Sequence, residues 1–192
     1  MDLSYLIKIY PEMGTPLIKL KSIQAPQKTE WVVEKAILKV ICGQMLSRKA
    51  AITIFDRLMD KSKGNPFQCM ELPDEALRKC GLSNQKLKTL KAVRDRSKAE
   101  GDLSHWSLLS YEELNKEVKS VWGLSQWSSD MLAIFYFGHP DVYPVGDGTL
   151  KKATDILNLK YFQNNEFDPQ KASPNKTLLS LSMWKLYDEG LI

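Results

Sequence analysis

The sequence predicts an all-α protein, and two patterns along the chain lead to this expectation. Apolar residues recur about every three or four positions through most of the chain, which is the spacing of one face of an amphipathic helix. Strict alternation of apolar and polar residues, typical of a half-buried strand, is nearly absent. Residues 142–145 are expected to be extended because prolines flank them. With 43% hydrophobic residues among 192, the chain can form one domain or two closely packed lobes.

The N-terminal part of the chain predicts a short helix and then a loop. Helical spacing stops before Pro11, and residues 14–26 are expected to cross the surface as an ordered loop. A strongly amphipathic helix is expected from Thr29 and ends at Gly43. Ser47 is a favoured N-cap for the helix that follows. The apolar face of the first of these two helices is formed by Val32, Val33, Ala36, Ile37, Val40 and Ile41.

The next segment predicts a loop and two helices, one of them with a basic face. Residues 61–67 are expected to form the loop, Pro73 opens a short helix that closes at Gly81, and Ser83 caps a longer helix. One face of the longer helix is basic and carries Lys86, Lys88, Lys91, Arg94, Arg96 and Lys98. A basic helix face is usually solvated, but these cations could also bind a phosphate backbone, and both alternatives stay open.

A capping-box sequence begins the second half of the chain. Ser110 and Glu113 have the spacing of such a box and predict a helix that reaches about Val121. A tight turn at 122–125 then leads to a second helix from about Ser125. The apolar face expected for this second helix consists of Trp127, Met131, Ile134 and Phe135.

The last part of the chain predicts two more helices. Asp147 stands at the start of the first one, and residues 164–168 form a polar loop after it. Ser173 and Pro174 have the sequence of an N-cap followed by proline at the first helical position, so the last helix is expected to begin there.

Composition excludes several classes of protein. The net charge of +4 is compatible with a polyanionic partner but does not imply one. Three well-separated cysteines, Cys42, Cys69 and Cys80, form no CxxC pair, which argues against a zinc ribbon or a disulfide framework. No apolar run reaches the roughly 18 residues of a membrane span, and the N-terminus lacks a signal-peptide pattern. An intracellular protein is therefore expected.

The stretch 120–150 combines two features that suit chemistry on nucleic acid. The turn exposes the first amides of the second helix, and these amides can bind a phosphate, although an ordinary helix–helix corner has the same sequence. Asp147 at a helix N-terminus is favoured in its charged form and can stabilise a cationic transition state or activate water. Asp141 reads as a loop acid. Three tryptophans are available to line a pocket or to fill the core, namely Trp122, Trp127 and Trp184.

Three segments of the chain together resemble one protein family. The hairpin region reads GLSQWSSDMLAIFYFGHPDVYPVGDGTL and resembles the helix-hairpin-helix and aspartate loop of the helix-hairpin-helix DNA glycosylase superfamily. Within it, the sequence is similar to the 3-methyladenine DNA glycosylase II branch, with its pattern G-I-G-x-W-T-A-x-M and then R-P-D-x-x-P-x-x-D. Two other segments agree: ILKVICGQMLSRKAAITIFDRL resembles a helix pair of the family, and PNKTLLSLSMW resembles its C-terminal helix. The resemblance thus runs in order from about Trp31 to Trp184.

The resemblance implies a two-lobed helical bundle with the active site in the cleft between the lobes. One lobe is expected from 1–30 with 143–192 and the other from 31–142, with the helix-hairpin-helix at 111–137. The implied activity is that of a monofunctional DNA glycosylase, which flips an alkylated purine such as 3-methyladenine out of double-stranded DNA, hydrolyses its N-glycosidic bond and leaves an abasic site. The implied protein is a monomer in the cytoplasm of a prokaryote or the nucleus of a eukaryote.

The resemblance also assigns roles to individual residues. Asp147 is the catalytic aspartate, and Met45 is the side chain that fills the stack left by the flipped nucleotide. The base pocket is expected from Trp127, Met131 and Trp184, whose aromatic faces attract an electron-poor base. The DNA contacts are expected from Gln44, Met45, Gly123, Leu124 and Ser125. No cofactor is required, but in the family a monovalent cation, Na⁺ or K⁺, is held by backbone carbonyls, here those of Lys119, Val121 and Leu124.

Some positions separate this chain from other branches of the superfamily, and others depart from the pattern of the branch that it resembles. Trp127 stands where strand-cutting relatives have a lysine, and no cysteine follows Cys80, so neither a lyase nor an iron–sulfur cluster is expected. Ser125 replaces the second hairpin glycine, and His139 replaces the arginine before P-D. A damaged-DNA-binding protein without activity, or a glycosylase for hypoxanthine or uracil, remains an alternative.

Overall fold

The computed structural model describes residues 2–20, 22–24, 26, 28, 30–162 and 166–192, and these residues contain helices and no strand. The predicted all-α fold is thus confirmed. The chain divides into two compact units, residues 1–27 with 138–192 and residues 28–137. Among the described residues, no helix combines the length and the apolar character needed to cross a membrane. The expected features at Thr29 and Asn164 lie outside the described residues.

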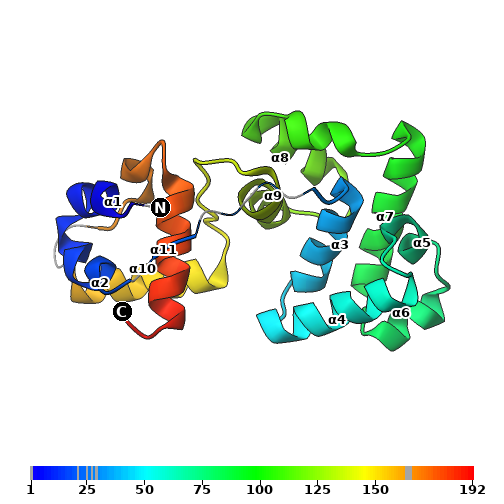
Figure 1. Cartoon of the computed structure of the whole chain (residues 1–192), viewed down its shortest axis with the longest axis horizontal. Helices are drawn as coiled ribbons and strands as arrows, with labels where there is room; N and C mark the ends of the chain where they lie inside the picture. Colours follow the sequence, from blue (N-terminus) through cyan, green and yellow to red (C-terminus); the bar gives the residue numbers. More distant parts are fainter. Residues whose placement is uncertain (1, 21, 25, 27, 29, 163–165) are drawn as a thin grey trace. The chain divides into compact units, whose positions relative to one another are not determined.

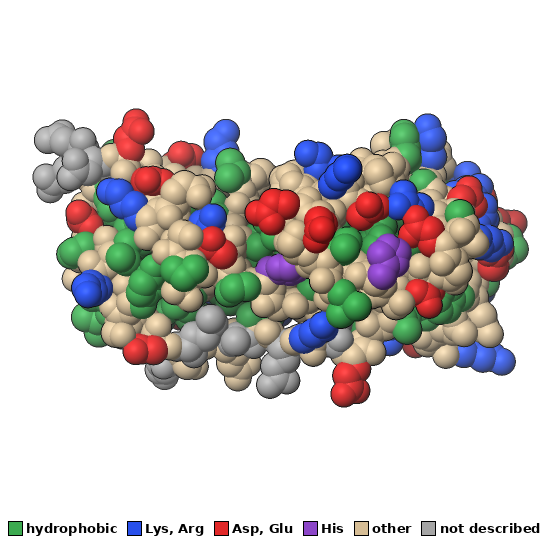
Figure 2. All heavy atoms as spheres, turned by 90° about the horizontal axis from the view of Figure 1, so that it is seen from above, with side chains coloured by type: hydrophobic (Ala, Val, Ile, Leu, Met, Phe, Trp, Pro, Cys, Tyr) green, Lys and Arg blue, Asp and Glu red, His purple; other side chains and the backbone are tan. Residues whose placement is uncertain are grey.

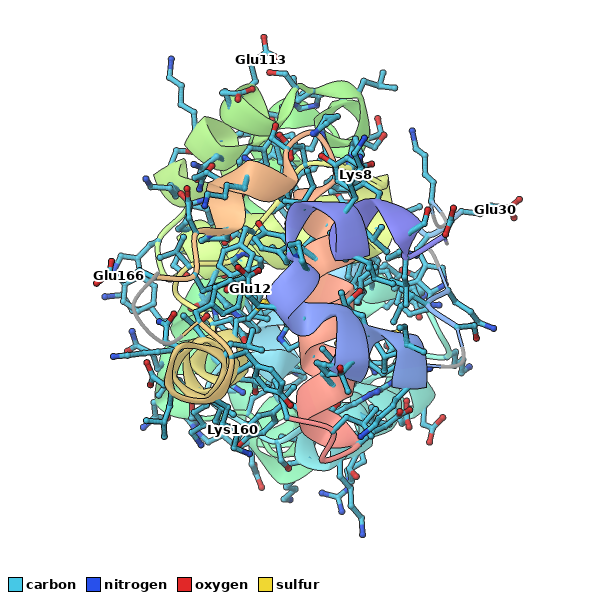
Figure 3. The ribbon with its side chains drawn as sticks, turned by 90° about the vertical axis from the view of Figure 1, so that its left-hand side faces the viewer. Lys8, Glu12, Glu30, Glu113, Lys160 and Glu166 are labelled. Carbon is cyan, nitrogen blue, oxygen red and sulfur yellow. The ribbon has the colours of Figure 1, made fainter. Side chains whose placement is uncertain are left out.

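The unit formed by both ends of the chain is a small helical cluster around a leucine-rich core. Leu6, Leu17, Leu157 and Leu186 are fully buried in it. Figure 3 looks onto this unit, with α1 and α2 in front of α11. Its helices are α1 (Ser4–Ile9), η1 (Pro11–Met13), α2 (Gly14–Lys19), α10 (Gly148–Lys160), η4 (Pro169–Ala172) and α11 (Lys176–Asp188).

The prediction of a loop at 14–26 is wrong for its first part, because residues Gly14–Lys19 form the helix α2. Pro16 lies in the first turn of this helix, where an amide hydrogen has no helical partner and proline is tolerated. Leu17 is buried in the core, so tertiary packing supports the helix. The expectation treated proline as a breaker without regard to its place in the helix.

The start of α11 also differs from the expectation. The helix begins at Lys176 rather than at Ser173, and its first amides bond to the segment before α10. The Thr177 amide donates to the Pro140 carbonyl at 3.0 Å, and the Lys176 amide donates to Asp141 Oδ1 at 3.2 Å. These bonds attach residues 138–142 to α11, within the unit that contains residues 138–192.

The unit formed by residues 28–137 packs around α3, with α4 and α7 beside it (Figure 1). Ile37, Leu58 and Trp106 are fully buried here. The helices of this unit are α3 (Val33–Gly43), α4 (Arg48–Lys61), α5 (Pro66–Met70), α6 (Asp74–Cys80), α7 (Asn84–Glu100), η2 (Ser104–Leu108), α8 (Tyr111–Ser120), α9 (Gln126–Leu132) and the π-helical turn η3 (Ala133–Phe137).

The helix ends in this unit confirm most of the predicted caps. Ser47 Oγ and Ser83 Oγ each accept an amide of the following turn at 3.3 Å, and Ser110 forms the capping box with Glu113. Gly81 ends α6 with φ +113°, the left-handed conformation expected of a C-terminal glycine. The loop expected at 61–67 is shorter, because α5 begins at Pro66.

The basic face predicted for α7 is wrong at Lys86. This side chain is buried, and its ammonium group donates to the Cys42 carbonyl at 2.8 Å, at the end of α3. Burial lowers the pKa of Lys86. Most of the other cations on this face are paired with carboxylates, so the face is not a uniform positive stripe.

Candidate active site and nucleic-acid interface

Asp147, the predicted catalytic aspartate, is the N-cap of α10 as expected. Its Oδ1 accepts the amides of Thr149 and Leu150, both at 3.0 Å. The same oxygen accepts the indole Nε1–H of Trp184 at 2.9 Å. Three donors from two helices therefore fix this carboxylate on rigid structure, which is what a group that acts on a reacting atom requires.

Trp184 thus does more than the sequence predicts for it. It was expected to be a wall of the base pocket, and the structure places it half-buried on α11 with its indole nitrogen bonded to Asp147. Two predicted site residues from distant parts of the chain are in this way brought together. Neither helical spacing nor capping signals this bond, because its partners lie 37 positions apart.

Tyr143 is a neighbour of this site that the sequence reasoning missed. Its hydroxyl lies 3.1 Å from Thr154 Oγ1 on α10. Burial raises the pKa of Tyr143, the hydrogen bond to Thr154 opposes this rise, and the negative charge of Asp147 adds to it. The phenol is therefore neutral at physiological pH and adds no charge beside the carboxylate.

Asp141 lies in the loop before α10, as expected for a loop acid, and its carboxylate accepts bonds from the start of α11. Oδ1 accepts the Lys176 amide, and Oδ2 accepts the Ser173 hydroxyl at 2.8 Å and faces Lys176 Nζ at 3.3 Å. Ser173, the residue expected to be the cap, donates its hydroxyl to Asp141, while Asn175 is the N-cap residue of α11. Both carboxylate oxygens of Asp141 therefore contact residues at the start of α11, and Asp141 stabilises this end of the helix.

The hairpin between α8 and α9 holds its shape through glycine at one position. Gly123 has φ +83°, and a Cβ added to it would lie 2.0 Å from Thr89 Oγ1 on α7. The turn therefore needs glycine both for its conformation and for its close contact with α7. Leu124 is buried, and its amide donates to the Val121 carbonyl at 3.1 Å.

Ser125, which replaces the second glycine of the family pattern, fits its place without strain. Its φ of −133° and ψ of 178° are extended values that any residue adopts. Its amide donates to Ser128 Oγ at 3.3 Å, and its side chain is exposed. At this position glycine is therefore not required by the backbone.

Gln44 and Met45 follow the end of α3 and differ in their contacts and exposure. Gln44 Nε2 donates to the Gly123 carbonyl at 3.0 Å and contacts Ser128 Oγ at 3.3 Å, so it ties the end of α3 to the turn. Met45 is fully exposed, with φ +55°. A positive φ is uncommon for a residue with a side chain. The predicted role of Met45 at the flipped nucleotide stays a prediction, and its full exposure leaves the side chain accessible to DNA.

Trp127 and Met131 both lie on α9 but differ in exposure. Trp127 is half-buried, and its ring edge lies beside Gly43, where an added Cβ would be 3.5 Å away. Met131 is buried, so it belongs mainly to the core of its unit. Their roles in a base pocket stay predictions. The helix widens into the π-helical turn η3 after Leu132, a feature that is frequent near functional sites.

A buried acid, Asp130, connects the two helices of the hairpin and was not predicted. Its Oδ1 accepts the Tyr111 hydroxyl at 2.5 Å and Gln126 Nε2 at 2.8 Å. Gln126 also accepts from Asn115 Nδ2 at 2.6 Å. Burial raises the pKa of Asp130, against the effect of its hydrogen bonds. This network fixes α8 relative to α9 and so supports the turn.

The carbonyls predicted to hold a monovalent cation lie at the end of α8 and in the turn. The Val121 carbonyl accepts the Leu124 amide and keeps a second lone pair. Neutral carbonyl oxygens suit Na⁺ or K⁺, and this donor set is compatible with such an ion. The described residues contain no group of three or more His, Cys, Asp or Glu side chains that could hold a metal.

Comparison with known protein families decides the family. The model of the HhH-GPD superfamily of base excision DNA repair proteins matches residues 38–166, a range that contains the hairpin and Asp147. The chain belongs to this superfamily. The predicted family resemblance is therefore confirmed, and the α8–α9 hairpin, where the helix-hairpin-helix (HhH) was predicted, lies within the matched range. Trp184 lies beyond the matched range, although it is bonded to Asp147 within it.

Two curated relatives and two solved structures are similar to this chain. Alkylbase DNA glycosidase-like protein mag2 of Schizosaccharomyces pombe is 27% identical over 161 residues, 80% of this chain and 76% of the relative. DNA-3-methyladenine glycosylase 1 of the same yeast is 27% identical over 155 residues, 74% of this chain and 66% of that protein.

Both structures have the fold of this chain. The S. pombe 3-methyladenine DNA glycosylase bound to abasic DNA has a TM-score of 0.77 and 22% identity, covering 91% of this chain and 88% of its own. The Bacillus halodurans DNA-3-methyladenine glycosidase has a TM-score of 0.72 and 24% identity, covering 97% and 90%.

Proposed function

We propose that this protein is a monofunctional DNA glycosylase that excises alkylated purines, 3-methyladenine among them, and leaves an abasic site. The observation that carries the proposal is the Asp147 carboxylate, held by three donors at the start of α10. The names of its relatives, which include 3-methyladenine glycosylases, support the same substrate class.

The chemistry asks little of the protein beyond one fixed negative charge. An alkylated purine that carries positive charge is already a good leaving group, so no general acid is needed. When the bond between the base and the sugar breaks, positive charge develops on the sugar carbon that held the base. Asp147 stabilises that charge while water attacks this carbon. The proton of the attacking water passes to the carboxylate or to solvent.

The residues of the hairpin unit would serve DNA binding. We assign Met45 to the gap in the base stack, where an apolar side chain offsets part of the lost stacking. The amides of the turn 123–125 would bind a backbone phosphate, which positions the protein without reading sequence. Gln44 would act indirectly, because its amide is bonded to the turn.

Two further assignments complete the proposal. Trp127 and Trp184 would contact the base through their aromatic faces, a contact worth about 0.5–2 kcal/mol for a cationic base. The carbonyls of Lys119, Val121 and Leu124 would hold a monovalent cation that adds positive charge near the bound phosphate. Because Trp127 occupies the place of the lysine of strand-cutting relatives, base excision without strand cleavage is expected.

The decisive experiment is release of free bases from methylated DNA, resolved by chromatography, for the wild type and Asp147→Asn. Asparagine keeps an oxygen that can accept the two capping amides, so only the charge is lost. Excision should fall by about a hundredfold or more while DNA binding persists. Asp155→Asn, an exposed charge on the same helix, is the matched control and should leave release unchanged.

The alternatives correspond to distinct outcomes of this experiment. Equal release by the wild type and Asp147→Asn would contradict the mechanism. Tight binding of abasic DNA without release of any base would favour a damage-binding protein of the same fold. Release of hypoxanthine or uracil from matched duplexes would change the lesion and not the role of Asp147. In each case the protein would act where DNA is kept, in a prokaryotic cytoplasm or a eukaryotic nucleus.

A further inference from the structure

Lys88 differs from the other basic side chains of α7. Lys86 is buried on a carbonyl oxygen. In the part of the chain that the structure describes, Lys88 forms no ion pair with a carboxylate, although its side chain is exposed. The four other cations of this helix are paired: Lys91 with Asp74, Arg94 with Asp95, Arg96 with Glu117 and Glu100, and Lys98 with Glu71.

Lys88 is instead held at the hairpin by an aromatic ring. Its Nζ lies 3.9 Å from the centroid of the Trp122 ring, and Trp122 directly precedes Gly123 in the turn. The neighbouring Thr89 lies against Gly123 itself. α7 and the turn are thus in direct contact, and Lys88 is the cation at that contact.

The nature of the partner matters for what Lys88 can bind. An aromatic face attracts a cation but does not cancel its charge, whereas a carboxylate does. A paired lysine must break its ion pair before it reaches a phosphate, but Lys88 has no such cost. On the face shown in Figure 2, acidic and basic side chains are interspersed. Among the described cations of α7, Lys88 is thus the exposed one that has no carboxylate partner and lies against the turn, which is a more specific signal than the net charge.

We infer that Lys88, positioned by Trp122, binds a DNA backbone phosphate next to the hairpin. The inference rests on the proposed function, since it needs duplex DNA on the turn. It extends the phosphate-binding surface from the hairpin onto α7 and assigns Trp122 a positioning role. Trp122 is 40% accessible and Lys88 is exposed, so the pair lies at the surface, where a phosphate can reach it.

The salt dependence of DNA binding tests this inference. Fluorescence anisotropy would measure the affinity of the wild type and Lys88→Gln for a labelled duplex with an abasic-site analogue, between 50 and 200 mM salt. Loss of one phosphate contact should reduce the slope of log K against log salt by about 0.9. The advantage of the wild type over Lys88→Gln should then shrink by about 3.5-fold across this range. Lys88→Arg should restore the slope, because arginine also stacks on indole.

Lys98→Gln provides the matched control, because it removes the same charge from the same helix at a residue paired with Glu71. Its slope should equal that of the wild type. An unchanged slope for Lys88→Gln, or an equal loss for Lys98→Gln, would overturn the inference while the wild type still binds and excises. A wild type that does not bind DNA would overturn both this inference and the proposed function. Thermal unfolding of each variant shows that the fold is kept.

Discussion

Gly123→Ala should break the contact between the hairpin and α7, and its cost can be estimated in two parts. The first part is conformational, because a residue with a Cβ at φ +83° destabilises the folded state by about 1–2 kcal/mol relative to glycine. The second part is steric, since the new Cβ would lie 2.0 Å from Thr89 Oγ1 and 2.9 Å from Thr89 Cβ. Displacing such a neighbour costs about 1–3 kcal/mol. The free energy of unfolding should therefore fall by about 2–5 kcal/mol.

Two companion variants separate these parts. Gly64→Ala places alanine at φ +78° with nothing within 4 Å of the added Cβ, so it should show the conformational cost alone. Thr89→Ala removes Oγ1, whose hydrogen bond is to the Gln85 carbonyl within α7. In the double variant Gly123→Ala/Thr89→Ala, part of the steric cost should disappear, and the loss should be at least about 1 kcal/mol smaller than the sum of the single losses.

Urea denaturation measures these free energies, and anisotropy with abasic duplex measures the effect on binding. Gly123→Ala should weaken DNA binding, whereas Gly64→Ala should leave it unchanged. If the losses of Gly123→Ala and Thr89→Ala add to within about 0.5 kcal/mol, the turn is not packed on α7, and the reasoning fails. A Gly123→Ala loss equal to that of Gly64→Ala would lead to the same conclusion.

Features that depend on a few neighbouring residues could be predicted from the sequence. Ser47, Ser83 and Ser110 cap their helices as expected, because a cap needs only a side-chain oxygen and the amides of the next turn. Asp147 was predicted at a helix start for the same reason. The all-α class followed from spacing alone.

Features that depend on distant parts of the chain were missed or misplaced. Ser173 has the sequence of a cap, but α11 begins at Lys176 after the N-cap residue Asn175, and the first amide of the helix donates to Asp141, 35 positions earlier. Lys86 was read as solvent-facing because one-dimensional spacing does not show that the end of α3 lies over it. The network around Asp130 was missed because a polar residue on an apolar helix carries no signal for its partner.

The candidate site repeats this division between local and distant information. The residues of the turn and Asp147 lie in one continuous stretch and could be recognised together. Trp184 was assigned from the resemblance as a pocket wall, and its bond to Asp147 became visible only in the folded chain. A residue's type and its approximate place can therefore be predicted, but which atom it donates to depends on tertiary structure.

Two further variants test the turn and its supports. Met45→Gly relieves a φ of +55° and buries or exposes no core, so stability should stay equal or rise by up to about 1 kcal/mol, while base release falls because the wedge is lost. Full base release by this variant would refute the wedge role. For Asp130, burial raises the pKa above the ordinary 3.8, so the unfolded chain loses this proton at a lower pH than the folded one. Stability of the wild type should then fall as pH rises from about 4 through the raised pKa, and Asp130→Asn, which keeps an acceptor for Tyr111, should escape this fall. Urea denaturation across this range would show a difference that grows with pH, and a difference independent of pH would mean that the Asp130 carboxylate is not desolvated.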